Sequence, residues 1–416
     1  MSLKGAVNPP GDKSISHRLG LLSLLAKGRC QVANFSPCAD CASTLAAARL
    51  LGVGVEQSGD RVALTGAAGE LTSAEVDCGN SGTTMRLLMG ILAGRPGSFT
   101  LSGDESLSRR PMQRVADPLN AMGAQVRCRE GKPPIAISGA PLHGVEHKLP
   151  VASAQLKSAL LLAGIQAEGQ TLVAEPAPSR DHTELLLKAC GADISRQDGL
   201  WRVSRSGLTL PPTLRVPGDA SSAAFFICGA VVTPGSRVEA HDVLLNPTRA
   251  GFLKVLQRMG ARIDIQEQGR DPEPWGLVSA AYSPDLRACQ VEAWEIPLLV
   301  DEVPILALAA TQARGVTVFK QVGELRIKES DRLGAIVSQL GAMGAKLEER
   351  GEDLLIHGPA KLSAPDHELD SFGDHRIAMT LAMAGEAAGQ APRIKDADCA
   401  AISYPGFARD WQRLKA

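Results

Sequence analysis

A short segment near the start of the chain, Pro10 to Arg18, holds the residue types that bind anions. It places Lys13, Ser14 and Arg18 within six positions, directly after a Pro-Gly turn. The apolar run that follows, Leu19 to Ala26, indicates a helix, and the positive end of that helix would favour the same ligand. We therefore expect this segment to bind a phosphate or a carboxylate.

Further basic residues recur in short polar segments, each next to glycine, serine or proline. They are Arg86, Arg109, Arg110, Arg180, Arg326, Lys328, Arg332 and Arg376. The planar guanidinium matches the oxygens of carboxylates and phosphates, so several arginines at one site would imply substrates with several negative charges.

Two small-residue segments before apolar runs could present backbone amides to a ligand. Asn80 to Thr84 precedes one run, where a tight structural turn is the alternative interpretation. Ala152 to Ser158 opens another expected helix and offers hydroxyl and amide groups at its N-terminus. Both segments are candidate anion-binding loops.

Acidic candidates accompany these cations. Asp301 and Glu302 begin a helix-like run, where capping of the helix dipole is the simpler interpretation. Glu329 is flanked by Lys328 and Arg332, which would keep its carboxylate charged or let it exchange protons in a crowded site.

Composition limits the class of protein. A chain of 416 residues predicts two domains, while a net charge of -1 and 3% aromatic residues argue against nucleic-acid binding. We find no charged leader before a long apolar stretch and no apolar run of membrane-spanning length, so we expect a soluble protein. Nine scattered cysteines indicate reduced thiols in the cytoplasm. Cys38 and Cys41 form one C-x-x-C pair, but without a second pair or a suitably placed histidine we do not predict a zinc site.

One sequence pattern occurs five times: a helix-like segment that ends in a glycine turn and leads into a short strand. The glycines lie roughly 70 to 85 residues apart, which suits a whole α/β unit. They are Gly52, Gly123, Gly191, Gly260 and Gly344. A second repeated motif, Pro-Gly-Asp, occurs at Pro10-Gly11-Asp12 and at Pro217-Gly218-Asp219. The two copies lie about half the chain apart and mark candidate crossovers between two domains.

In combination, these motifs closely resemble the 5-enolpyruvylshikimate-3-phosphate synthase branch of the enolpyruvyl transferase family. The resemblance covers segments 10–18, 79–86, 109–112, 152–158, 179–184, 326–332 and 374–379, in order. It implies a mixed α/β (α+β) fold with two globular domains, each built from three β-α-β-α-β-β units. The N-terminal domain would span 13–218, and the C-terminal domain would combine 1–12 with 219–416. The two crossovers between them would form the hinge.

The resemblance also implies an activity. A family member transfers the enolpyruvyl group of phosphoenolpyruvate to the 5-hydroxyl of shikimate 3-phosphate and releases phosphate (EC 2.5.1.19), in chorismate and aromatic amino-acid biosynthesis. It needs no metal or organic cofactor, and it is the target of the phosphoenolpyruvate competitor glyphosate. We expect a cytoplasmic monomer that binds these two small molecules, and neither nucleic acid nor membrane.

Site residues follow from the resemblance, position by position. The expected contacts of shikimate 3-phosphate are Lys13, Ser14, Arg18, Ser153, Ala154, Gln155, Arg180, Asp301 and Lys328. Those of phosphoenolpyruvate are Lys13, Gly82, Arg110, Gln155, Arg332 and Arg376. Asp301 matches the carboxylate beside the 5-hydroxyl, Glu329 matches the proposed proton donor to the methylene carbon, and Lys13 completes the catalytic set.

The chain departs from parts of the family, and two alternatives stay open. Ile402 stands where some members have a lysine that contacts phosphoenolpyruvate, and Ala154 replaces a serine of another branch. The related UDP-N-acetylglucosamine enolpyruvyl transferase usually has a cysteine in the loop matching 103–111, where this chain has none; the nearest one downstream is Cys128. An inactive anion-binding homologue would lack the acid and base carboxylates, yet Asp301 and Glu329 are both present.

Overall fold

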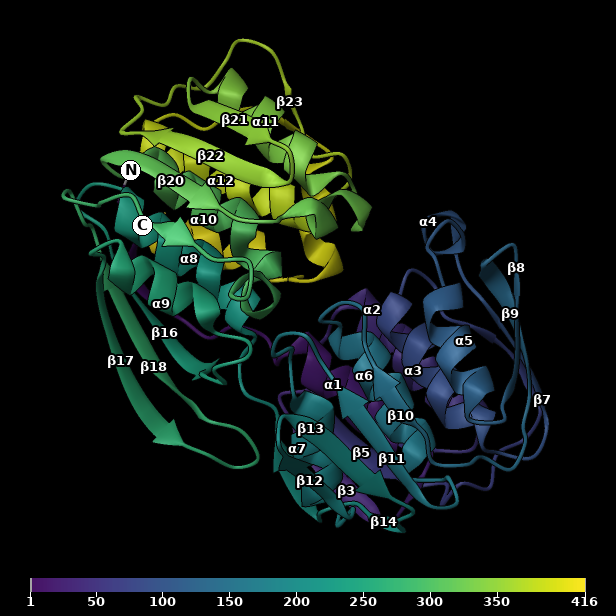
Figure 1. Ribbon diagram of the computed structural model, residues 1–416. Coiled ribbons are helices and arrows are strands. Elements are labelled where there is room, and N and C mark those ends of the chain that lie inside the picture. The colour runs from purple at the N-terminus through teal and green to yellow at the C-terminus, as the bar shows by residue number, and fades with distance from the viewer. Residues whose placement is uncertain (1, 416) are drawn as a thin grey trace. The chain divides into compact units, whose positions relative to one another are not determined.

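The chain forms two compact units in the computed structural model, which describes residues 2–415 (Figure 1). The N-terminal unit comprises residues 11–216. The C-terminal unit comprises residues 217–416 together with the first ten residues. The boundaries expected from the sequence, 12/13 and 218/219, each lie two residues further along the chain.

Five four-stranded sheets share one topology. In order across each sheet, the first strand pairs in parallel with the second, and the third strand pairs antiparallel with both the second and the fourth. The N-terminal unit holds three such sheets: β15 (Thr213–Arg215), β3 (Arg29–Ala33), β5 (Arg61–Thr65) and β4 (Gly54–Ser58); β6 (Ala74–Asp77), β7 (Ser98–Ser102), β9 (Lys132–Ser138) and β8 (Gln125–Arg129); and β10 (Glu146–Lys148), β11 (Gln170–Ala174), β13 (Leu200–Ser204) and β12 (Ile194–Gln197). A short parallel pair, β2 (Ala26–Lys27) and β14 (Leu208–Thr209), accompanies them.

The C-terminal unit holds the other two complete sheets. They are β1 (Lys4–Val7), β16 (Arg237–Leu244), β18 (Trp275–Ala281) and β17 (Arg262–Gly269), and β19 (Gln290–Val291), β20 (Gly315–Phe319), β22 (Asp353–Gly358) and β21 (Lys346–Arg350). Because β1 pairs with β16, the first residues of the chain complete a sheet that otherwise comes from its second half.

Two helices belong to each repeat, one after the first strand and one after the second. The first helices are α1 (Lys13–Leu22), α3 (Gly82–Ala93), α6 (Ala154–Gly164), α8 (Ala220–Val232), α10 (Val303–Thr311) and α12 (His375–Ala388). The second helices are α2 (Ala39–Leu50), α5 (Gln113–Ala121), α7 (His182–Ala189), α9 (Gly251–Arg258), α11 (Arg332–Ala342) and α13 (Phe407–Lys415), and α4 (Glu105–Ser108) is an extra short turn. The first helices form the core: every residue of α8 and of α10 is buried. No helix among residues 2–415 is long and apolar enough to cross a membrane.

The sixth repeat differs from the expectation of three complete units in each domain. Within the described chain it consists of β23 (Leu369–Asp370), α12, β24 (Ile394–Lys395) and α13, without the final hairpin. In its place, aromatic side chains around α13 pack on α8: the Phe407 ring stacks on that of Phe226 with 5.3 Å between centroids, and Tyr404 meets Phe226 edge-on.

The five repeat glycines all end a helix in the same way. Their φ angles lie between +83° and +112°, a conformation that costs glycine little and other residues more. In each case the glycine N–H bonds to the carbonyl three residues back, and the next N–H bonds to the carbonyl five residues before it, as in Gly123 to Asn120 and Ala124 to Leu119. This is the Schellman motif, so the repeat found in the sequence is a repeated helix cap followed by a hairpin.

The two Pro-Gly-Asp segments also have matching structures. Asp12 caps α1 by accepting from the N–H of Ile15, and Asp219 caps α8 by accepting from the N–H of Ser222. Glycine is required at Gly11, because a Cβ there would lie 1.7 Å from the carbonyl oxygen of Asn34. The chain passes between the two units at these segments.

Candidate active site

In the N-terminal unit, three buried helices begin with the residues expected to bind substrate. Asp12, Ser81 and Ser153 are the N-caps of α1, α3 and α6, and each side chain accepts a backbone N–H from the first turn. The expected residues in these first turns are Lys13, Ser14, Gly82, Ala154 and Gln155. Positive helix ends of this kind favour bound anions.

Arg86 fixes the side chain of Gln155. Its Nη1 donates to Oε1 of Gln155 at 2.6 Å, and Nε2 of Gln155 donates to the hydroxyl of Thr83 at 2.9 Å. Arg86 is 6% exposed and connects the starts of α3 and α6. From the sequence, Arg86 was only one of several candidate cations. Its contact with Gln155 was not predicted.

Arg18 is buried and joins three helices. Its Nε donates to the hydroxyl of Thr183 at 2.6 Å, Nη2 donates to that of Ser158 at 3.0 Å, and Nη1 donates to the carbonyl of Ser14. These bonds connect α1, α6 and α7. The guanidinium expected to contact shikimate 3-phosphate is therefore also a structural clamp with neutral partners.

A buried chain of neutral groups runs from α1 to α3. His17 Nδ1 lies 2.6 Å from the hydroxyl of Thr44, which lies 2.6 Å from that of Thr84. Burial, together with the nearby charge of Lys13, lowers the pKa of His17 to about 3. His17 is thus neutral at physiological pH and supports the start of α3 without adding charge.

Lys13 and Arg110 each have partners that the sequence did not predict. The ammonium of Lys13 forms an ion pair with Asp40 in the first turn of α2. Arg110 Nη2 donates to the side-chain oxygen of Asn80 at 2.8 Å. A Cβ at Gly82 would lie 2.7 Å from Nη1 of Arg86 and 3.3 Å from Nη1 of Arg110, so glycine leaves room between two guanidinium groups.

A buried ion cluster lies next to Arg180. Lys157 Nζ is 2.8 Å from Glu175, 2.7 Å from Glu184 and 3.4 Å from the carbonyl of Ser179. All three charged side chains are at most 4% exposed, and burial raises the pKa of Glu184 although Lys157 opposes the rise. No local sequence pattern indicated that Lys157 contacts Ser179, which is 22 positions away.

In the C-terminal unit, one arginine gathers three carboxylates. Arg332 donates from Nε to Asp374 at 2.8 Å, from Nη1 to Asp301 at 3.1 Å, and from Nη2 to Glu329. Its side chain is 1% exposed. Burial alone would lower the pKa of Arg332, but Asp374, Glu329 and Asp301 together raise it well above its ordinary value. The two expected proton-transfer carboxylates therefore share one guanidinium.

Arg376 approaches the same acids from the first turn of α12. Its Nη1 donates to the backbone carbonyl of Asp301 at 3.2 Å, and Nη2 lies 3.6 Å from the Asp301 carboxylate. Its neighbour His375 is buried, which lowers its pKa to about 4. Lys328 pairs with Glu324 at 2.5 Å on its own segment. Ile402, at the position where some family members have a lysine, is 38% exposed.

A second buried network, missed in the sequence, lies behind Asp301. Arg249 Nη1 donates to Glu302 at 2.7 Å, and its Nη2 lies 3.4 Å from Asp219, the cap of α8. The side chains of Arg249 and Glu302 are 2% and 0% exposed. Arg249 thus connects a crossover segment to the residue next to the expected base.

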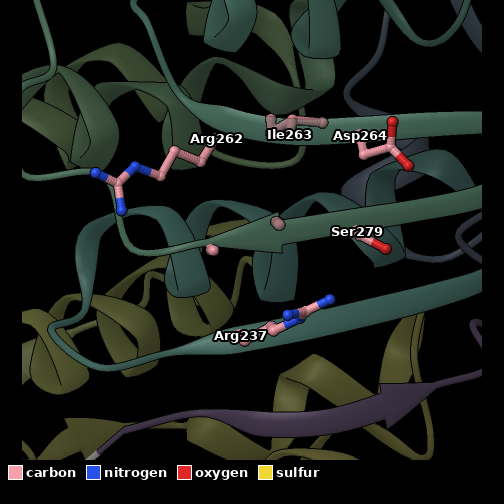
Figure 2. A pocket seen from close by; sticks show the side chains of 7 residues that line it. Arg237, Arg262, Ile263, Asp264 and Ser279 are labelled. Atoms are coloured by element: carbon pink, nitrogen blue, oxygen red, sulfur yellow. The ribbon is translucent and has the colours of Figure 1, made fainter.

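A pocket of about 330 Å³ lies apart from all expected site residues, on the sheet of β16, β17 and β18. Figure 2 shows Arg262 and Asp264 on β17, Ser279 on β18 and Arg237 on β16 around it. Arg237, Ala281 and Arg262 lie in one cross-strand row. The groups around this pocket include no proton-transfer residue of the expected set.

The repeats and helix starts define an enolpyruvyl transferase fold. The structure of the enolpyruvyl transferase NikO from Streptomyces tendae superimposes with a TM-score of 0.80 at 20% identity, covering all of this chain and 95% of that one, which shows the fold alone. EPSP synthase from Acinetobacter baumannii superimposes with a TM-score of 0.88 at 38% identity, covering 99% of this chain and 96% of its own.

Sequence comparison gives the particular family. The family model EPSP synthase (3-phosphoshikimate 1-carboxyvinyltransferase) matches residues 1–411. The chain is 45% identical over 412 residues to 3-phosphoshikimate 1-carboxyvinyltransferase of Bacillus velezensis, covering 98% of this chain and 96% of that one. It is 47% identical over 422 residues to that of Desulforudis audaxviator, covering 99% and 97%. The chain belongs to the EPSP synthase family, and its activity is that of a 3-phosphoshikimate 1-carboxyvinyltransferase (EC 2.5.1.19) of the shikimate pathway.

Proposed function

We propose that the chain joins phosphoenolpyruvate to the 5-hydroxyl of shikimate 3-phosphate with residues from both units, in the roles expected from the sequence. Both substrates carry phosphate and carboxylate groups and repel each other. The site must therefore supply fixed cations before the substrates can meet.

Shikimate 3-phosphate binds, in this proposal, mainly to the N-terminal unit. The start of α6 offers the hydroxyl of Ser153 and the amide of Gln155, and Lys13 and Arg180 supply charge. The remaining contacts are Ser14, Arg18, Ala154, Asp301 and Lys328. Contacts within the N-terminal unit support this assignment. Arg86 holds the side chain of Gln155, and Arg18 is hydrogen-bonded to residues of α6 and α7.

Phosphoenolpyruvate takes contacts from helix starts in each unit. Gly82 and Arg110 contribute from around α3, and Arg332 and Arg376 contribute from α11 and α12. Lys13 and Gln155 complete the set. Because Arg332 already holds Glu329, an incoming anion would compete with that carboxylate and release it toward the substrate.

The carboxylates then move protons. Glu329 protonates C3 of phosphoenolpyruvate, C2 becomes electrophilic, and the 5-hydroxyl attacks C2 as Asp301 accepts its proton. The product is a tetrahedral intermediate. Loss of phosphate and of one C3 proton then restores the double bond, so one acid must also serve as a base, with Lys13 in the same coupled set.

The proposal also covers properties of the whole chain. The two crossovers act as a hinge, and closure excludes water from the tetrahedral intermediate. All nine cysteines are free thiols, which supports a reducing, cytoplasmic location. The monomeric state stays a prediction that sedimentation equilibrium would test.

The observation that carries the mechanism is the contact of Asp301 and Glu329 with the single guanidinium of Arg332. Phosphate release from phosphoenolpyruvate, measured in parallel with shikimate 3-phosphate and with UDP-N-acetylglucosamine, tests the function. We expect release only with shikimate 3-phosphate. Release only with UDP-N-acetylglucosamine would favour the alternative, UDP-N-acetylglucosamine enolpyruvyl transferase. Binding without release would favour an inactive homologue.

A further inference from the structure

Arg249 and Arg332 occupy matching places in successive repeats. Arg332 begins α11, Arg249 lies two residues before the first residue of α9, and a glycine follows each arginine at the second position. Each arginine also contacts the N-cap residue of the first helix in the next repeat. Arg332 donates to Asp374, the N-cap of α12, and Arg249 donates to Glu302, the N-cap of α10. The Arg249–Glu302 pair is therefore the counterpart of a pair at the centre of the candidate site.

The two arginines differ in what a ligand can reach. The carboxylates around Arg332 include Asp301 and Glu329, which are 16% and 32% exposed. The side chains of Arg249 and Glu302 are only 2% and 0% exposed. A substrate bound at the exposed carboxylates has no access to Arg249, so any effect of Arg249 on the reaction must act through another residue.

The Glu302 carboxylate is held through one of its oxygens. Oε1 accepts from Nη1 of Arg249 at 2.7 Å and from the hydroxyl of Ser221, to which Nη2 of Arg249 also donates. Oε2 is buried and has no hydrogen-bond partner among residues 2–415. Burial of an ionised carboxylate is costly unless a cation accompanies it, so Glu302 depends on the charge of Arg249.

Arg376 is the other cation that contacts Glu302 among the described residues. Its Nη1 lies 3.8 Å from Oε1 of Glu302 and donates to the backbone carbonyl of Asp301 at 3.2 Å. Its Nη2 lies 3.6 Å from the Asp301 carboxylate. The guanidinium expected to hold phosphoenolpyruvate thus lies beside a buried acid that Arg249 holds more closely.

We propose that Arg249 is a positioning residue for the reaction: it holds the Glu302 carboxylate, so that Arg376 stays at Asp301 and keeps its charge available to phosphoenolpyruvate. Without Arg249, the buried carboxylate would attract the Arg376 guanidinium. That shift would weaken the bond from Arg376 to the Asp301 carbonyl and its contact with the substrate. This inference rests on the proposed role of Arg376.

Arg249→Met tests the inference, because it removes the charge and keeps much of the side-chain length. Calorimetry measures the Kd of shikimate 3-phosphate, and then the Kd of glyphosate with shikimate 3-phosphate saturating. Phosphate release gives the KM for phosphoenolpyruvate. We expect the glyphosate Kd and this KM to rise by about tenfold or more, since misplacement of a positioned group by about 1 Å can cost 10²-fold. The Kd of shikimate 3-phosphate should change by less than about threefold, because that substrate binds mainly to the N-terminal unit in our proposal.

A second substitution separates positioning from a general loss of structure. Adding Glu302→Gln removes the competing charge and keeps an oxygen that can accept from Ser221. The double variant should therefore recover the glyphosate Kd to within about threefold of the unmodified chain. If Arg249→Met does not fold in a urea-unfolding assay, Arg249→Lys with and without Glu302→Gln repeats the comparison, with a smaller loss and the same recovery.

Arg258→Met is the matched control, because it removes another arginine pair that begins on α9. Its partner is Glu295, and the Arg258 side chain is 40% exposed. We expect each of the three constants to stay within about twofold of the unmodified chain.

The outcomes separate this inference from the proposed function. An unchanged glyphosate Kd and KM in folded Arg249→Met would overturn the positioning role, and so would weakened binding that Glu302→Gln does not restore. If the unmodified chain bound glyphosate but released no phosphate, the proposed function would fail, and the glyphosate Kd values would still decide the role of Arg249. If it bound no glyphosate, the proposed role of Arg376 would fail, and this inference with it.

Discussion

In the N-terminal unit, Arg18 is hydrogen-bonded to neutral oxygens, and Lys157 is paired with carboxylates that are not among the expected site residues. Arg18 donates to two hydroxyls and a carbonyl, and Lys157 contacts two acids that are at most 4% exposed. In the C-terminal unit, Arg332 instead contacts three carboxylates, of which Asp301 and Glu329 are 16% and 32% exposed. Two of the carboxylates around Arg332 are therefore partly exposed, whereas both carboxylates around Lys157 are buried.

This difference suggests a division of labour. Cations fixed by neutral partners keep their full charge for an anionic substrate. Carboxylates that share one guanidinium can be displaced from it by an incoming anion, and then they can exchange protons. We therefore expect substitutions in the C-terminal cluster to affect chemistry first, and those in the N-terminal cluster to affect stability or binding first.

Arg332→Met should have the largest effect. It removes the proposed phosphoenolpyruvate contact and the common partner of Asp301 and Glu329, so phosphate release should fall by about 10³-fold or more. Arg258→Met is a control from the same unit, because it removes only a partly exposed pair with Glu295. Release within about tenfold of the unmodified chain for Arg332→Met would remove Arg332 from the centre of the site.

Lys157→Met should mainly reduce stability. It leaves Glu175 and Glu184 buried without their cation, and breaking such a pair costs about 3–5 kcal/mol of unfolding free energy. Urea unfolding measures the change. Lys320→Met removes a more exposed pair with Asp353 and should cost less than about 1 kcal/mol. Equal losses of unfolding free energy for both variants would show that burial does not make the Lys157 cluster more important for stability.

Acid should weaken both units through one histidine in each. The pKa of His17 is lowered to about 3 and that of His375 to about 4, against 6.5 in the unfolded chain. Between these values only the unfolded chain binds the proton, so stability is complete above pH 6.5 and falls as pH decreases, by about 2 kcal/mol per histidine at pH 5.

The corresponding variants assign that loss to each unit. Urea unfolding of His17→Gln and His375→Gln at pH 7 and pH 5 should each show a smaller difference between the two pH values than the unmodified chain does. An unchanged pH dependence in either variant would contradict the neutral state assigned to that histidine.

Gly82→Ala should have the smallest effect, and it should be selective. The added methyl group would lie 2.7 Å from Arg86 and 3.3 Å from Arg110, so it narrows the proposed phosphoenolpyruvate pocket. We expect glyphosate inhibition to weaken by about tenfold or more, roughly 1.4 kcal/mol, with the KM for shikimate 3-phosphate nearly unchanged. Inhibition curves at fixed phosphoenolpyruvate measure this, and unchanged inhibition would count against the placement of Gly82.

Local features of the fold were predictable from the sequence. Gly123 and Gly260 indicated the C-terminal ends of helices, since a glycine that adopts positive φ and is followed by a strand is a local sequence pattern. The helix expected over Leu19 to Ala26 was placed too late, because α1 begins at Lys13, directly after its cap Asp12, and ends at Leu22. The repeated pattern occurs five times, once for each complete hairpin, and the expectation of a sixth complete unit came from the family resemblance. The packing of Phe407 on Phe226 in the sixth repeat is a long-range contact that no local pattern encodes.

Most of the side-chain contacts within the candidate site could not be predicted from the sequence. Arg332 meets Asp374 from 42 positions away, and Arg249 meets Glu302 from 53 positions away, and no local pattern encodes such distances. Lys157 lies in the segment Ala152 to Ser158, where a lysine could equally have had its charged end in solvent, so the sequence did not indicate its buried partners.

Glu329→Gln tests the central claim most directly, because glutamine keeps the size of the side chain and removes its acid. Turnover by phosphate release and the Kd of shikimate 3-phosphate by calorimetry should be measured on the same preparation. We predict that turnover falls by about 10²-fold or more while the Kd changes by less than about threefold. Full turnover in Glu329→Gln would contradict the account, since the carboxylate held by Arg332 would then have no part in proton transfer.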